Sequence, residues 1–198
     1  MNGLEREEAI SRAIAYLMFS KLFYKPEKST ESMIGQFLKI AEIERGTKIP
    51  GTFLIDELEI EYNRLFVGPG HVLCPPYESV YRKDRPPLER GLVMGPSVVD
   101  VQRRYLEAGL QKSKDYKDLP DHIAVELEFM HYLCLKEAEE MNENWVKMQR
   151  DFLRMHIKPW YREFVRCIEK HTKSEFYLTL AEELEKFLEE EINVLVEG

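Results

Sequence analysis

Apolar residues recur at spacings of three and four along most of this chain, and this periodicity is the feature that most constrains its fold. Such spacing places apolar side chains on one face of an α-helix. No stretch alternates apolar and polar residues for long enough to predict a β-strand. We therefore predict an all-α protein whose helices bury their apolar faces against one another.

Capping residues, glycines and prolines divide the chain into predicted helices. These helices cover residues 4–24, a segment from 29 or 30 to the break at 48–52, a segment from there to Gly68 and Pro69, 97–108, a segment opening at 119–121, 144–157, 160–169 and 174–192. We expect inward-facing residues in four of them: Ile10, Ile14, Leu17 and Met18; Leu54, Leu58, Tyr62 and Leu65; Ile123, Leu127, Met130 and Cys134; Trp145, Met148, Phe152 and Met155. The predicted fold is a single-domain globular multi-helix bundle over residues 1–198.

One long irregular segment, at about residues 68–96, interrupts the helices and holds four glycines and six prolines. We predict a loop there, with one short helix at 88–94. Loops of this length inside a compact domain are usually either functional or disordered. The segment is therefore the first place to look for a binding site.

Composition excludes several classes of protein. The net charge of −8 argues against nucleic-acid binding, because phosphate contacts need lysine and arginine. An acidic surface suits a basic partner, or it serves only to keep the protein soluble. The longest uncharged apolar run, residues 13–20, is far shorter than the roughly 20 residues of a membrane span, and the N-terminus does not resemble a signal peptide. An odd number of cysteines without a CxxC motif predicts no disulfide framework, and a reducing cytoplasm fits.

Motifs for catalysis or metal binding have little support. The chain has no P-loop and no GxSxG elbow. Glu128 and His131 form a single ExxH, whereas a di-iron bundle needs two such pairs and two further glutamates. His71 and Cys74 lack further ligands, and Cys134 and Cys167 fall on apolar helical faces. We predict no catalytic residue, no metal and no cofactor.

Asp121, His122 and Glu126 lie near the start of one predicted helix, with His122 and Glu126 one turn apart. A solvated helix edge, on which an acid near the N-terminus is favoured by the helix dipole, explains them without a function. The alternative is an acidic, histidine-bearing lip against which a cationic ligand docks.

Five segments together resemble the TorD/DmsD/NarJ-type family of redox-enzyme maturation chaperones. They are EYNRLFVGPG at 61–70, PPYESVY at 75–81, LPDHIAVELEFM at 119–130, FLRMHIKPWYREF at 152–164 and FYLTLAEELEKFL at 176–188. The resemblance implies an all-helical cytoplasmic chaperone. It would bind the twin-arginine leader, and sometimes the mature domain, of a molybdopterin oxidoreductase catalytic subunit until the molybdenum cofactor is inserted, without inserting into a membrane. It also implies a peptide-binding face at Asp121, His122 and the loop from Tyr77 to Tyr81.

The residues themselves are consistent with a receptor for such a leader. Two guanidinium groups need carboxylates, and the apolar stretch after them needs an apolar groove. The predicted carboxylates are Glu78, Asp121 and Glu126. The predicted apolar contacts are Tyr77, Tyr81, Leu65 and Phe66. Pro76 is predicted to hold Tyr77 and Glu78 in place at low entropic cost to binding. The alternatives are a loop that packs over the bundle and buries its tyrosines, an acidic helical adaptor for another basic protein, and a metal- or nucleotide-dependent enzyme.

Overall fold

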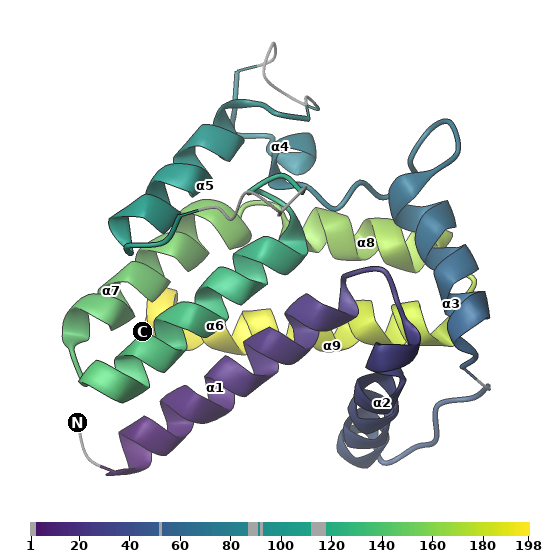
Figure 1. The fold of residues 1–198 in the computed structure, drawn as a ribbon, viewed down its shortest axis with the longest axis horizontal. Helices are drawn as coiled ribbons and strands as arrows, with labels where there is room; N and C mark the ends of the chain where they lie inside the picture. The colour runs from purple at the N-terminus through teal and green to yellow at the C-terminus, as the bar shows by residue number, and fades with distance from the viewer. Residues whose placement is uncertain (1–2, 52, 87–90, 92, 112–117) are drawn as a thin grey trace.

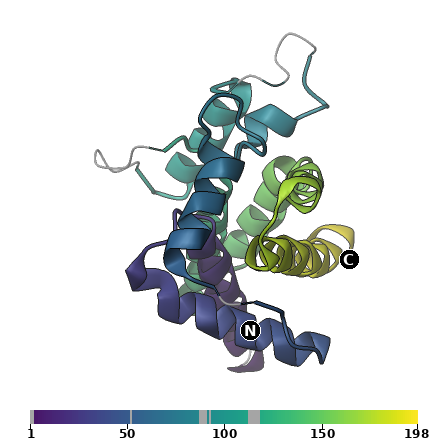
Figure 2. The same ribbon diagram turned by 90° about the vertical axis from the view of Figure 1, so that its right-hand side faces the viewer.

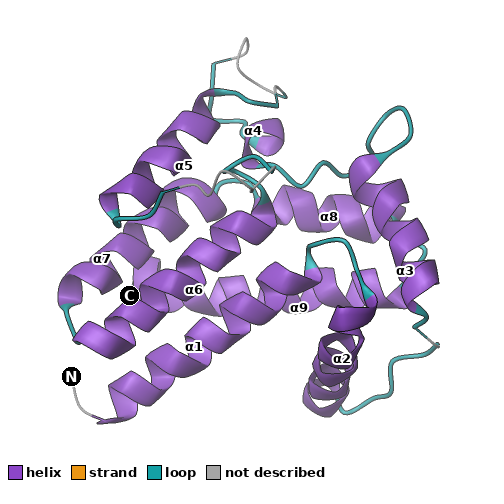
Figure 3. Cartoon of the chain, in the orientation of Figure 1, coloured by secondary structure: helices purple, strands orange, loops and turns teal. Residues whose placement is uncertain are grey.

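Helices make up most of the computed structural model, which describes residues 3–51, 53–86, 91, 93–111 and 118–198 (Figures 1 and 3). The elements are α1 (Gly3–Leu22), α2 (Glu31–Arg45), α3 (Ile55–Tyr62), α4 (Glu78–Tyr81), α5 (Pro96–Glu107), α6 (Ile123–Glu140), α7 (Glu143–Phe152), α8 (Tyr161–His171) and α9 (Glu175–Ile192). Within these ranges no β-strand forms, which confirms the all-α prediction. None of the helices described is both long and apolar enough to cross a bilayer.

The bundle is built around α6. Helix α1 lies alongside α6 over much of its length, and α7 packs against α6 after a short turn (Figure 1). Helices α8 and α9 lie side by side, as Figure 2 shows, and α2 packs across α9 and α1. The short helix α4 contacts both α5 and α8. Because α4 also lies close to the start of α6, several helices meet where the long loop returns to the bundle.

The buried face of α6 is the one that the periodicity predicts. Ile123, Leu127, Met130 and Cys134 are all fully buried. Their spacing keeps one continuous apolar stripe against α1 and the core. Cys134 is a free, buried cysteine, as expected for a core residue.

The predicted face of α1 is wrong in the first half of the helix, whereas Met18 packs against the core as expected. Ile10 and Ile14 are 37% and 61% exposed, and the buried residues are Ala9, Ala13, Tyr16, Phe19, Ser20 and Leu22. Ala9 and Ala13 let α1 approach α6 closely. A periodicity search that looks for large apolar residues overlooks a contact face made partly of alanine. Leu54 and Met155, expected to face inward, are likewise exposed.

Two predicted helix ends coincide with unusual backbone. The helix that begins with α3 continues as a widened turn over Asn63–Val67 and stops at Gly68, whose φ of +104° favours glycine. The predicted helix 144–157 is regular only to Phe152, then forms a widened turn over Leu153–Ile157, and α8 starts after Pro159. This second turn brings His156 to the site described below.

The long loop differs from the prediction in two ways. Its described helix is α4, at Glu78–Tyr81, whereas most of the helix predicted at 88–94 lies outside the described residues. Cys74 and Cys167 form a disulfide that ties the loop to α8, so the prediction of no disulfide is wrong. The Cys74 N–H also donates to the Leu65 carbonyl oxygen at 2.8 Å. The chain leading to α4 is thus held at the end of α3 and at α8.

Candidate functional site

The loop segment around α4 is joined by backbone hydrogen bonds to the chain that starts α6. Tyr77 and His122 form an isolated antiparallel bridge. The Glu78 N–H donates to the Asp121 carbonyl oxygen at 2.9 Å, and the Ile123 N–H donates to the Pro76 carbonyl oxygen at 2.9 Å. The structure therefore brings together the two predicted parts of the site, which are 40 or more positions apart in the sequence.

His122 caps α6, which begins at Ile123 and not, as predicted, with Pro120 in its first turn. The His122 Nδ1 accepts a hydrogen bond from the Ala124 N–H at 3.1 Å. Its ring stacks on Tyr24 with centroids 5.9 Å apart and meets the edge of Tyr77 at 5.2 Å. Burial lowers the pKa of His122 to about 4, so the imidazole is neutral near pH 7.

The predicted carboxylates are buried rather than exposed. Glu78, Asp121 and Glu126 have no solvent-accessible surface. Burial raises the pKa of Asp121, and burial together with the charge of Glu78 raises the pKa of Glu126 well above its ordinary value. The solvated helix edge is thus ruled out. The carboxyl groups that were expected to form an acidic docking surface are not accessible to solvent in this conformation.

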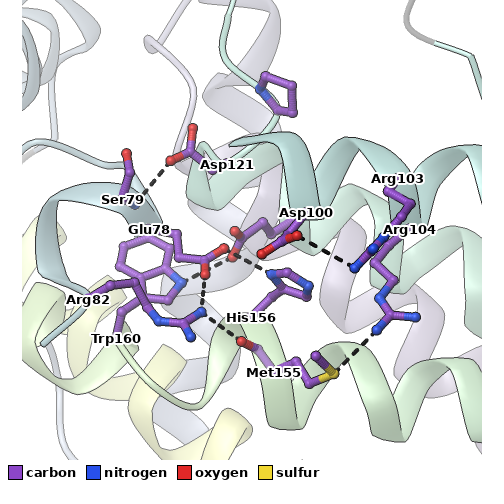
Figure 4. A network of polar contacts seen from close by, with 12 residues as sticks. Glu78, Ser79, Arg82, Asp100, Arg103, Arg104, Asp121, Met155, His156 and Trp160 are labelled. Atoms are coloured by element: carbon purple, nitrogen blue, oxygen red, sulfur yellow. Dashed lines mark hydrogen bonds and ion pairs between the residues drawn. The ribbon is translucent and has the colours of Figure 1, made fainter. Parts of the chain in front are cut away.

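Hydrogen bonds link the three carboxyl groups to neighbouring elements (Figure 4). The Ser79 N–H donates to Asp121 Oδ2 at 3.0 Å, and Trp160 Nε1 donates to Glu126 Oε2 at 3.2 Å. Glu78 forms an ion pair with Arg82, and His156 Nδ1 lies 3.1 Å from Glu78 Oε2. The cluster is therefore shared by α4, the start of α6, the turn before α8 and the loop.

Sequence reasoning did not assign three members of this cluster, Arg82, His156 and Trp160. His156 and Trp160 belong to FLRMHIKPWYREF, a segment that carries the family resemblance. Arg82 follows Glu78 by four positions, the spacing at which opposite charges meet on a helix. Both observations were available in the sequence, but no helix was predicted at 78–82.

Several buried polar atoms in the cluster lack a hydrogen-bond partner. They are Ser79 Oγ, Tyr81 Oη, Asp121 Oδ1, Glu126 Oε1 and His156 Nε2. Buried polar atoms in folded proteins are nearly always paired, so their concentration in one place marks a buried polar cluster whose hydrogen bonds the described residues do not complete.

The predicted aromatic and apolar contacts divide into two groups. Tyr77 and Tyr81 are partly exposed, and Tyr81 stacks on Trp160 at 5.7 Å. Leu65 and Phe66 are core residues, 0% and 5% exposed, so the prediction that they line an open groove is wrong for this conformation. Phe66 instead packs on Phe164, which meets the edge of Tyr81. The loop therefore packs over the bundle, with its two tyrosines only partly covered.

An apolar groove that the sequence did not indicate runs between α5 and α6, beside Pro120. Its volume is about 450 Å³. The apolar lining comes from Tyr105, Leu106, Pro120, Val125, Phe129 and Tyr132. The Tyr105 hydroxyl donates to the Pro120 carbonyl oxygen at 2.8 Å, so one end of the groove adjoins the Asp121–His122 turn.

The residues considered for a metal have other partners. Glu128 forms an ion pair with Lys21 at 3.0 Å, and His131 Nδ1 lies 2.8 Å from the Ala13 carbonyl oxygen. Cys74 is in the disulfide. Among the described residues, no group of three or more histidine, cysteine or acidic side chains is arranged to hold a metal ion.

Residues 38–166, which contain every element of this cluster, match the model of the nitrate reductase delta subunit family. The chain belongs to this family. Family membership is supported by a selenate reductase assembly chaperone protein of Thauera selenatis, 31% identical over 85% of this chain and 82% of that protein. A chlorate reductase assembly chaperone protein of Ideonella dechloratans is 30% identical over 66% of this chain and 68% of that protein.

Other family relatives agree with the resemblance seen in the sequence motifs, which is thereby confirmed. The chaperone protein TorD of Vibrio parahaemolyticus is 27% identical over 66% of this chain and 60% of that protein. A crystal structure from Archaeoglobus fulgidus, described as a redox enzyme maturation protein, covers 96% of both chains with a TM-score of 0.54 and 29% identity.

Proposed function

We propose that this protein is an assembly chaperone for the catalytic subunit of a molybdopterin oxidoreductase. The observation that carries this proposal is the similarity, over 85% of the chain, to an assembly chaperone of selenate reductase. The chlorate reductase chaperone and TorD support the same class of function. The protein would hold the immature subunit until its cofactor is inserted and so delay export, which requires that it act in the cytoplasm.

The twin-arginine leader of that subunit is the proposed ligand of the cluster around α4 and the start of α6. Carboxylates are the natural partners of guanidinium groups, and Glu78, Asp121 and Glu126 supply three. Glu78 already binds one guanidinium, that of Arg82. Because the three carboxyl groups are buried, binding requires the α4 segment to move away from α6, which selects an open conformation.

The apolar stretch that follows the arginines is proposed to lie in the groove between α5 and α6. The groove adjoins the Asp121–His122 turn at Pro120, and its lining is largely aromatic and aliphatic. The acidic cluster and the apolar groove thus follow one another in the order in which a leader presents charge and then apolar residues. Tyr77 and Tyr81 flank the cationic part, and Pro76 fixes the chain before them.

Co-purification tests this function directly. The chain is expressed with catalytic subunits of molybdopterin oxidoreductases from its own source, as the cofactor-free form, the cofactor-loaded form and a form without the leader. We expect a complex with the cofactor-free form that weakens when the leader is deleted or when Asp121→Asn is introduced. Asp151→Asn, which removes the same charge from an ion pair with Arg154 outside the cluster, is the matched control.

Two outcomes would overturn the proposal. Equal capture of the cofactor-free and cofactor-loaded enzymes would contradict a role in assembly. Equal capture of unrelated basic proteins would indicate an acidic adaptor, which has no preference for paired arginines.

A further inference from the structure

Arg82 is held by acceptors on every nitrogen of its guanidinium. Its Nε and Nη2 donate to Asp84 Oδ1 and Oδ2, both at 2.6 Å. Its Nη1 donates to the Met155 carbonyl oxygen at 2.7 Å and to the Glu78 carboxylate (Figure 4). The planar guanidinium presents its donors in a rigid fork, which a lysine ammonium does not reproduce. Glu78, Asp84 and the Met155 carbonyl therefore form a complete guanidinium-binding site.

Further acceptors beside this site are left without donors. Asp121 and Glu126 are both 0% exposed, yet Asp121 Oδ1 and Glu126 Oε1 have no hydrogen-bond partner. Leaving such an oxygen unpaired is costly, so it is rare in a folded protein. The cluster thus contains one guanidinium from the chain itself and unpaired carboxyl oxygens that a second guanidinium could use.

We propose that Arg82 is an internal stand-in for a client arginine, and that one arginine of the bound leader displaces it from Glu78 and the Met155 carbonyl. This inference rests on the proposed function. The second leader arginine donates to Asp121 and Glu126, the acceptors that Arg82 does not reach. The site therefore selects two neighbouring arginines over two lysines, since both positions use the fork.

The exchange is feasible because one guanidinium replaces another. Removing a cation from buried Glu78 would leave an uncompensated charge, which is strongly unfavourable. Replacement keeps Glu78 paired throughout. Asp84 has a side chain that is 56% exposed, so water can solvate its carboxylate once Arg82 leaves the site.

Weakening the hold on Arg82 tests the exchange. Asp84→Asn removes the charge that retains Arg82 and leaves Glu78 untouched, and the exposure of Asp84 makes the variant tolerable for folding. We expect a twin-arginine leader peptide to bind up to about fivefold tighter by calorimetry, the upper end of what an exposed ion pair supplies. Asp151→Asn, which loses an equal charge that pairs with Arg154 away from the cluster, should leave the affinity unchanged. Equal affinity for the two variants would overturn the exchange.

Chemical rescue tests the guanidinium site without any leader. Arg82→Ala vacates the site, and millimolar ethylguanidinium should raise the melting temperature of this variant but not that of the wild type. Ethylammonium at the same concentration should not. Rescue by both cations, or by neither, would refute a guanidinium-specific site. If Arg82→Ala does not fold, the comparison of Asp84→Asn with Asp151→Asn still decides.

The two experiments separate this inference from the proposed function. A wild-type protein that binds no leader, together with rescue by ethylguanidinium, would overturn leader binding and leave the guanidinium site standing. Leader binding that depends on both arginines but is indifferent to Asp84→Asn would retain the proposed function and overturn the role of Arg82.

Discussion

The Cys74–Cys167 disulfide joins two positions 93 residues apart and connects the loop before α4 to α8. Its reduction should therefore destabilise the fold mainly by restoring freedom to the unfolded chain. Closure of a loop of this length corresponds to about 4.5 kcal/mol in the chain-entropy treatment. For 198 residues the entropy of unfolding is about 0.4 kcal/mol/K, so we expect the melting temperature to fall by roughly 10 °C.

The assay is thermal unfolding of the oxidised protein with and without a phosphine reductant, beside Cys74→Ala/Cys167→Ala. Reductant should lower the melting temperature of the wild type to that of the double variant and should not affect the double variant. Cys134 is free in both proteins and serves as an internal control for reagent effects. Coincident melting curves for the oxidised and reduced wild type would refute the reasoning.

Three further substitutions test the account of the cluster and the core. The pKa of His122 is lowered, so below about pH 6.5 the unfolded chain binds a proton that the folded chain does not. Wild-type stability should therefore fall by up to about 3 kcal/mol as pH drops from about 6.5 to 4. In denaturant titrations, His122→Asn, which keeps the helix cap, should remove this dependence. The raised pKa of Glu126 predicts the opposite pH dependence: its contribution to stability is greatest below the ordinary pKa of 4.5 and is lost as pH rises towards the raised pKa. Glu126→Gln, which can keep the Trp160 hydrogen bond, should be as stable as the wild type at pH 4 and more stable at pH 7. Leu65→Ala should cost about 3 kcal/mol in urea unfolding and leave the leader affinity of the folded protein unchanged, whereas an affinity loss without destabilisation would place Leu65 in the binding surface.

Periodicity predicted the helices best where the buried residues are large and aliphatic. The stripe of α6 is an example, because Ile123, Leu127 and Met130 are large, apolar and fully buried. It failed on α1, where the buried face contains Ala9 and Ala13 and the exposed face carries Ile10 and Ile14. Hydrophobicity alone does not distinguish a close helix contact made by small residues from a weakly packed surface.

The candidate site was only partly predictable. The resemblance joined Tyr77–Tyr81 to Asp121 and His122, which the backbone bridge confirms as neighbours. Burial of the carboxyl groups and the disulfide depend on residues distant in sequence, such as Trp160 and Cys167, so no local pattern specifies them. The helix α4 was missed because prolines 75 and 76 mark the loop as irregular, although they end just before α4 begins.

The most direct test of the central claim is calorimetric titration of the protein with one twin-arginine leader peptide in three forms. The arginine pair is retained, changed to two lysines, or changed to two alanines, with the apolar stretch kept constant. We predict that affinity falls by about tenfold or more for lysine, because the fork is lost, and further for alanine. Equal affinity for the three peptides would contradict a guanidinium-reading chaperone and would leave the buried cluster without the role proposed for it.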